Sequence, residues 1–160
     1  MRASAARFGR ESHIRFSLSL RPILAETEEA AWARAAAILE DAKTLRAAGQ
    51  GGHRWQKKAE AQGAKRLLEA AAGGAVRDKR LWTEIAALTG AQGNSTSLVG
   101  TPEQVCESML DYWDLGVTTF LIRGFDPLED ALEYGRDLMP LVREATAARA
   151  APVMLRNATS

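Results

Sequence analysis

Apolar and polar side chains alternate from Ile14 to Arg21, and this period of two predicts a strand with two different faces. Pro22 is expected to end that strand. Thr27 then offers a helix N-cap, two acidic residues follow it, and an Ala-rich run leads to Gly49. These signals predict a helix of about six turns, and the strand and helix together form one β-α unit.

The next stretch, residues 50–80, is polar and punctuated by glycines, so we interpret it as an insert within a single domain that spans residues 1–160. Toward its end, apolar residues recur at spacings of three and four, which predicts a helix. That helix is expected to run from about Lys79 to Leu88, with Leu81, Trp82, Ile85 and Leu88 on one face.

Two further β-α units follow the insert. A short strand is expected within residues 93–100, and Thr101 with Gln104 forms a capping box for a helix that stops at Gly116. The near-continuous apolar run from 117 to 122 is typical of a strand that is covered on both faces. The last helix is predicted to begin at Asp126, Pro127 and Glu129 and to run through Val142, with a frayed tail after Thr146.

Alternation of strands and helices predicts an α/β fold with a parallel sheet and right-handed crossovers. A three-stranded open sheet with helices on one side would leave one face uncovered and an edge strand exposed at each end. We therefore expect about three β-α units, with their helical insert, to be the C-terminal part of a (β/α)8 TIM barrel, a fold of about 250 residues.

Composition and charge exclude several other classes of protein. Hydrophobic residues make up 46% and charged residues 26% of the 160-residue chain, as in ordinary globular proteins. The 21 basic and 20 acidic residues are spread along the chain, so no nucleic-acid partner is expected. No apolar run approaches the length of a membrane span, and the single Cys106 with no metal-ligand spacing favours a metal-free protein of the cytoplasm.

Four stretches of the sequence resemble the C-terminal part of the luciferase-like flavin-dependent monooxygenases, in particular their alkanesulfonate monooxygenase branch. They occur in the family's order, with an insert in the expected place, and together cover nearly the whole chain. The stretches are residues 16–32 (FSLSLRPILAETEEAAW), 93–105 (GNSTSLVGTPEQV), 115–127 (LGVTTFLIRGFDP) and 128–140 (LEDALEYGRDLMP). The resemblance implies that barrel strands six to eight are present and that the first five are not in this sequence.

This resemblance also implies an activity. Members of the family take reduced FMN (FMNH2) from a separate NAD(P)H-dependent flavin reductase, react it with oxygen, and oxidise an alkanesulfonate to an aldehyde and sulfite. The expected partners are thus an alkanesulfonate-type small molecule, the reductase and the N-terminal half of the barrel, in an enzyme that is a homo-oligomer when complete. Alone, this C-terminal fragment is expected to be inactive.

Functional groups of barrels lie at the carboxyl ends of strands, where this sequence places Ser19 and Arg21 on one face of its first strand. Arg21 is a candidate catalytic residue because its guanidinium can bind a sulfonate or phosphate through two bonds, and Ser19 is a candidate substrate contact. The family has an Arg and a His at these two positions, so the chain departs from the usual sulfonate contacts. A solvated charge at the strand end is the alternative role for Arg21.

A second group of candidates follows the later strands. Arg123 is a catalytic candidate that binds the sulfonate or the flavin phosphate, with an ion pair to Asp126 or Glu129 as the alternative. Phe125 stands where the family carries a pocket aromatic, commonly Tyr, and is a candidate substrate contact. In the loop before the short strand, the cofactor-binding candidates are Asn94, Ser95 and Thr96, although such residues also bond to their own backbone.

The insert of residues 50–80 resembles the mobile lid of the family. Its His53, flanked by glycines and basic residues, is a candidate substrate contact, and a solvated loop is the alternative. Two other functions remain open for the whole chain. One is a non-catalytic half-barrel that serves as an oligomerisation or regulatory module, and the other is a deazaflavin-dependent oxidoreductase of the same fold.

Overall fold

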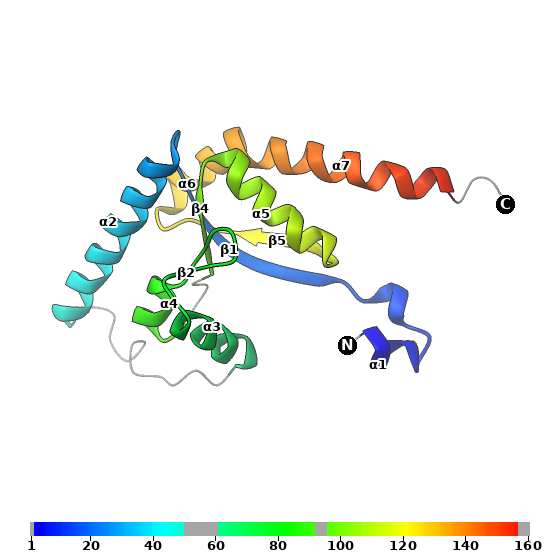
Figure 1. Ribbon diagram of the computed structural model, residues 1–160, viewed down its shortest axis with the longest axis horizontal. Coiled ribbons are helices and arrows are strands. Elements are labelled where there is room, and N and C mark those ends of the chain that lie inside the picture. The colour runs from blue at the N-terminus through cyan, green and yellow to red at the C-terminus, as the bar shows by residue number, and fades with distance from the viewer. Residues whose placement is uncertain (1, 50–60, 92–95, 157–160) are drawn as a thin grey trace.

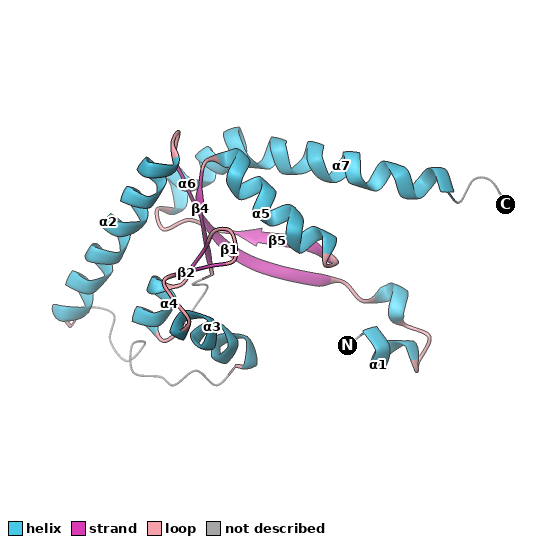
Figure 2. Cartoon of the chain, viewed as in Figure 1, coloured by secondary structure: helices cyan, strands magenta, loops and turns pink. Residues whose placement is uncertain are grey.

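The computed structural model describes residues 2–49, 61–91 and 96–156. Short strands and longer helices alternate along most of it, as Figures 1 and 2 show. The strands are β1 (Phe16–Leu24), β2 (Val76–Arg77), β3 (Leu81–Trp82), β4 (Ser97–Gly100) and β5 (Val117–Ile122). The α-helices are α1 (Arg2–Ala6), α2 (Glu28–Ala47), α3 (Gln62–Ala72), α4 (Glu84–Thr89), α5 (Pro102–Asp114), α6 (Pro127–Glu133) and α7 (Met139–Arg156), with a 3-10 turn at Glu11–His13 and a π-helical turn at Tyr134–Leu138.

The five strands form one mixed sheet in the order β2-β3-β4-β1-β5. Strand β1 is central and pairs in parallel with β4 on one side and with β5 on the other. Strand β3, just after the insert, pairs with the outer edge of β4 in antiparallel orientation, and β2, within the insert, pairs antiparallel with β3. A mixed α/β fold with parallel β-α units is therefore confirmed.

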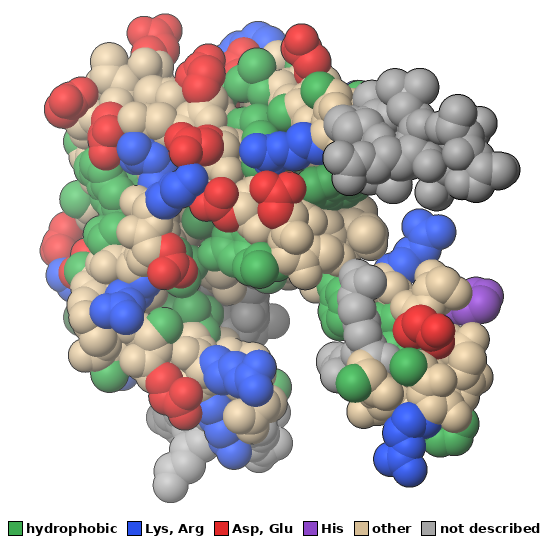
Figure 3. Space-filling view, turned by 45° about the vertical axis from the view of Figure 1, so that its right-hand side comes forward, with side chains coloured by type: hydrophobic (Ala, Val, Ile, Leu, Met, Phe, Trp, Pro, Cys, Tyr) green, Lys and Arg blue, Asp and Glu red, His purple; other side chains and the backbone are tan. Residues whose placement is uncertain are grey.

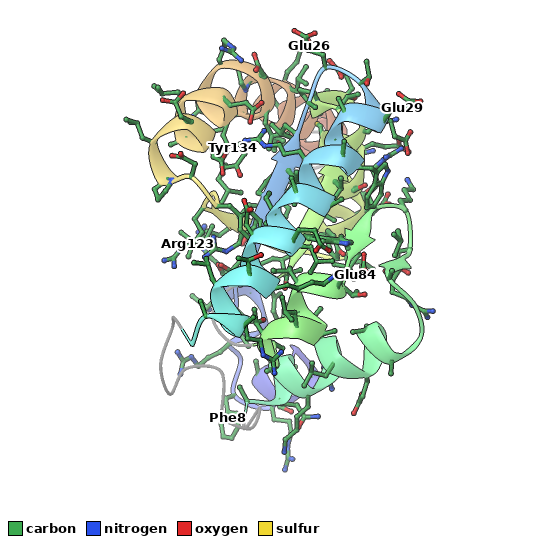
Figure 4. All side chains as sticks on the ribbon, turned by 90° about the vertical axis from the view of Figure 1, so that its left-hand side faces the viewer. Phe8, Glu26, Glu29, Glu84, Arg123 and Tyr134 are labelled. Atoms are coloured by element: carbon green, nitrogen blue, oxygen red, sulfur yellow. The ribbon has the colours of Figure 1, made fainter. Side chains whose placement is uncertain are left out.

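Helices cover both faces of the sheet. On one face, Leu20 and Leu98 pack with the apolar residues of α5 and of the chain after α6. On the other face, Ile23 and Val99 pack with α2 and α4. Figure 4 looks onto this second face, with α2 in front of β1. The sheet thus differs from the open three-stranded sheet with helices on one side that was considered from the sequence, because α2 and α4 lie over the second face and β3 protects the edge of β4.

The order of the parallel strands bears on the barrel. Consecutive strands of a (β/α)8 barrel lie side by side, which would place β4 between β1 and β5. Here β1 lies between the other two, and the sheet is open. The arrangement therefore confirms the α/β class but not the barrel.

Pro22 was expected to end the first strand. This was wrong, because β1 continues to Leu24. The N–H of Arg21 points toward β4 and donates to the carbonyl oxygen of Thr96 at 2.8 Å. Successive N–H groups of a strand point to opposite sides, so the missing N–H of Pro22 lies on the β5 side. Strand β5 has already ended there, at Ile122, and no ladder bond is lost.

The helix predicted from Lys79 to Leu88 was wrong in its first half. Leu81 and Trp82 belong to β3 and pair with β4, and helix α4 begins only at Glu84. The free edge of β4 provides backbone hydrogen bonds that the local spacing of apolar residues cannot reveal. Trp82 is buried in the core, where it packs with apolar residues of α2.

Other helix signals are confirmed. Thr27 caps α2 by accepting a hydrogen bond from the N–H of Ala30, and Thr101 and Gln104 form the predicted capping box of α5. Strand β5 is also present, but the prediction that both its faces are covered was wrong, because α2 does not extend over it and Leu121 is 54% exposed. The last helical segment, α7, runs past the predicted end at 142 to residue 156.

Candidate functional site

A cavity of about 520 Å³ opens where β1 and β5 part. The last ladder bond between them joins the N–H of Arg123 to the carbonyl oxygen of Leu20 at 3.2 Å. In a continued parallel ladder, the carbonyl of Pro22 would accept from the N–H of Phe125. Side chains satisfy both groups instead, and the strands separate. The lining residues are Arg21, Ile122, Arg123, Gly124, Phe125, Pro127, Ala131, Tyr134 and Met139.

Arg21 crosses from β1 to the loop after β5. Its Nη1 donates a hydrogen bond of 2.5 Å to the carbonyl oxygen of Gly124, and its guanidinium carbon lies 4.9 Å from the centre of the Phe125 ring. Such a cation over an aromatic face is held by the negative potential of the ring. Burial lowers the pKa of Arg21, and the neighbouring positive charge of Arg123 lowers it further. The site thus places two cations near one cavity.

The loop that receives Arg21 is held by Asp130. One carboxylate oxygen of Asp130, Oδ2, accepts hydrogen bonds from the N–H of Phe125 at 2.6 Å and of Asp126 at 3.0 Å. The other oxygen, Oδ1, pairs with Arg34 of α2 at 2.5 Å. Gly124 packs so closely on Asp130 that a Cβ at that position would overlap the carboxylate. Residue 124 must therefore be glycine, because the backbone there lies directly against the Asp130 side chain.

Tyr134 closes the wall of the cavity from the π-helical turn. Its side-chain hydroxyl donates a hydrogen bond of 2.5 Å to the carbonyl oxygen of Pro22, which the sheet ladder leaves without a strand partner. The residue is 3% exposed, and burial raises the pKa of its phenol strongly. Tyr134 is thus a neutral hydrogen-bond donor at neutral pH. In Figure 4, Tyr134 and Arg123 lie on the same side of α2.

The structure brings together three of the residues predicted for the site, Arg21, Arg123 and Phe125, at one cavity. Thr96 lies beside them through its backbone, since its carbonyl accepts from the N–H of Arg21. Ser19 is on the same face of β1 as Arg21 but does not line the cavity. The remaining candidates, Asn94, Ser95 and His53, lie outside the described residues.

The alternative role expected for Arg123 was an ion pair with a neighbouring acid. Within the described ranges, Arg123 forms no ion pair with Asp126 or Glu129, and Asp126 caps α6 instead. Sequence reasoning missed Asp130 and Tyr134. The acid signals before α6 pointed to its first turn, and nothing local distinguishes the buried Asp130 from the exposed acids around it.

A second, wider cavity of about 1180 Å³ lies past the ends of β1 and β4. Its charged lining is mostly paired, because Arg34 binds Glu133 at 2.8 Å and Arg136 binds Asp137 at 2.7 Å. Charges of both signs are also interspersed on the molecular face in Figure 3. Among the residues the structure describes, no group of three or more His, Cys, Asp or Glu could hold a metal ion.

The cavity has the chemistry of an anion site. Guanidinium groups bind phosphate and sulfonate oxygens through paired N–H donors, and the Phe125 ring suits an apolar chain or a flat ring. The volume falls in the range of small-molecule sites, about 300–1,000 Å³. Both an alkanesulfonate and the phosphate-bearing end of a flavin would fit this donor set.

Fold and site together define an α/β protein with arginines gathered where its parallel strands end. The sequence model of the luciferase-like monooxygenase family matches residues 1–119, about three quarters of the chain, and the chain belongs to this family. Membership supports an enzyme of the flavin-dependent monooxygenase kind, and the family commonly uses reduced flavin. In the part of the chain that the structure describes, no helix is both long and apolar enough to cross a membrane.

Proposed function

We propose that this chain provides the substrate-anion site of a monooxygenase that uses reduced FMN, and that its substrate is an alkanesulfonate. The observation that carries the proposal is the position of Arg21 and Arg123 at one cavity whose other walls are largely apolar. The positive charge of Arg123 lowers the pKa of Arg21, and an anion bound beside the two guanidinium groups would reduce this repulsion. An alkanesulfonate offers such an anion together with an apolar chain.

Each side chain then has a defined task. Arg21 and Arg123 hold the sulfonate oxygens, and Phe125 and Met139 contact the carbon chain and exclude water from it. Reduced FMN, when bound, supplies the two electrons that activate oxygen. The overall reaction converts the alkanesulfonate, oxygen and FMNH2 into an aldehyde, hydrogen sulfite, FMN and water. We further propose that a separate NAD(P)H-dependent reductase delivers the flavin and that the complete enzyme forms homo-oligomers.

Anion binding can be tested with the 160-residue chain itself. Isothermal titration with hexanesulfonate should give saturable binding, and Arg21→Met and Arg123→Met should each weaken it by about tenfold, the effect of one lost charge-assisted contact. Arg15→Gln, which removes an exposed arginine just before β1, is the matched control and should bind as the parent does. Absence of binding in the parent, or equal affinity in all variants, would exclude the proposed site.

A non-catalytic module is the second candidate function. It is favoured by one observation: helices cover both faces of the sheet, α5 on one and α2 with α4 on the other, whereas a barrel carries its helices on the outer face alone. Strand β3 also covers the outer edge of β4. Titration of reduced and oxidised FMN under anaerobic conditions separates the two functions. Flavin binding, and sulfite release in air once a flavin reductase, NAD(P)H and hexanesulfonate are added, supports the enzyme and would overturn the expectation that this fragment is inactive alone. A folded chain that binds neither flavin nor hexanesulfonate supports the module.

A further inference from the structure

We propose that Asp130 is a positioning residue of the arginine site, which holds the loop at residues 123–126 so that Gly124 and Phe125 receive Arg21. The inference rests on the proposed function only where it concerns anion affinity. The geometry of the loop is independent of the ligand. Asp130 itself does not line the cavity, so it acts through the residues that do.

The two oxygens of the carboxylate have different partners. Oδ2 binds the backbone N–H groups of Phe125 and Asp126, and Oδ1 binds the guanidinium of Arg34. The side chain is 4% exposed, so water cannot replace these partners readily. One buried carboxylate therefore joins the loop after β5 to helix α2.

Arg34 extends this connection to the end of β1. Its Nη1 donates to the carbonyl oxygen of Leu24 at 2.7 Å and to Glu133 at 2.8 Å. Although burial alone would lower the pKa of Arg34, its hydrogen bond to Glu133 and the charges of Glu133 and Asp130 raise it, so the cation persists. Loop, helix and strand end are thus fixed relative to one another, and β1 carries Arg21.

Helix capping does not account for Asp130. Helix α6 already has a cap in Asp126, whose Oδ1 accepts from the N–H groups of Leu128 and Glu129. Asp130 lies one turn further on and reaches back to N–H groups at and before that cap. Those are the groups that set the backbone of Phe125, and hence the position of its ring beneath Arg21.

The test compares Asp130→Asn, which keeps the size and one acceptor oxygen but removes the charge, with Asp130→Ala. Glu133→Gln is the matched control, because Glu133 is the other carboxylate on Arg34 but makes no bond to the loop amides. Thermal unfolding and circular dichroism identify the variants that fold. In those, the Nε–H resonance of Arg21 and the ring resonances of Phe125 report the site geometry by NMR.

We expect both resonances to shift in the folded Asp130 variants and to stay in place in Glu133→Gln. Hexanesulfonate affinity should fall about tenfold in the Asp130 variants and by less than about twofold in the control. Unchanged Arg21 and Phe125 resonances in a folded Asp130 variant would overturn the inference. If the parent does not bind hexanesulfonate, the proposed function fails, and the resonances alone decide the role of Asp130.

One measurement on the parent chain covers the case in which neither Asp130 variant folds. The amide protons of Phe125 and Asp126 donate to a buried carboxylate, so they should exchange with solvent at least about a hundredfold more slowly than the exposed amides of the same loop region. Protection at both positions supports the role of Asp130. Rapid exchange at both would show that the carboxylate does not hold the loop.

Discussion

The guanidinium of Arg21 donates a hydrogen bond to the carbonyl oxygen of Gly124, a residue 103 positions further along the chain. This contact joins the central strand of the sheet to the loop that follows its edge strand. It exists because β1 and β5 part beyond Leu20, which leaves room for the side chain between them.

Gly124→Ala should destabilise the protein by about 2–4 kcal/mol, because the added methyl group overlaps the buried Asp130 and forces the loop to move. Urea unfolding measures the change in the free energy of unfolding. Gly135→Ala is the matched control: apart from its chain neighbours and the backbone of its own helical segment, no heavy atom lies within 4 Å of the added Cβ. It should be neutral or slightly stabilising. Equal costs for both substitutions would contradict the close packing at Gly124.

Tyr134→Phe should cost about 1–2 kcal/mol, since it removes a buried hydrogen bond and leaves the carbonyl of Pro22 unsatisfied. Tyr112→Phe is the control, because the structure gives the Tyr112 hydroxyl no hydrogen-bond partner among the described residues. Thermal unfolding at neutral pH provides the comparison. A Tyr112 variant that loses as much stability as the Tyr134 variant would show that the hydrogen bond is not the cause.

Tyr134 should also govern stability in alkali. Burial raises the pKa of its phenol above the unfolded value of about 10, so the unfolded state releases the proton first. The contribution is complete below that value and is lost as the pH rises toward the folded pKa. Between about pH 9 and 11.5, the parent should therefore lose stability more steeply than Tyr134→Phe. Parallel curves for the two proteins would exclude this linkage.

Glu28 should make the stability of the protein depend on pH under acidic conditions. Hydrogen bonds from Arg80, and then from Gln104 and Trp32, lower the pKa of Glu28 to about 2. Its contribution is present above the unfolded pKa of about 4.5 and is lost as the pH falls toward 2. Acid unfolding followed by circular dichroism should thus show a weaker pH dependence for Glu28→Gln over that window. Glu29→Gln, which changes an exposed neighbour, should follow the parent curve.

Strand order can be tested by a disulfide. Ser17 and Thr119 are register partners on β1 and β5, and both are exposed. Cysteines at these two positions should form an intrachain bond on mild oxidation, detected by mass spectrometry of the digested protein. The single variant Ser17→Cys, in which the buried Cys106 is the other thiol, should form none within the chain. Failure of the pair to cross-link would argue for a different order of strands in solution.

Several parts of the fold could be predicted because their signals are local. Thr101 and Gln104 satisfy each other's backbone groups within one turn, so the start of α5 needs no distant partner. The site was partly predictable from the expected parallel sheet. Arg21, Arg123 and Phe125 lie at or just after strand ends, and strand ends converge at one edge of a parallel sheet.

The sequence by itself determined the β-α units, the helix caps, the family and three residues of the cavity. Only the tertiary structure decided that β1 lies between β4 and β5, that Leu81 and Trp82 form a strand, and that Asp130 and Tyr134 complete the site. The physical reason is common to all three. Each depends on a backbone or side-chain group being satisfied by a residue distant in the sequence or by burial, and neither periodicity nor propensity along the chain contains that information.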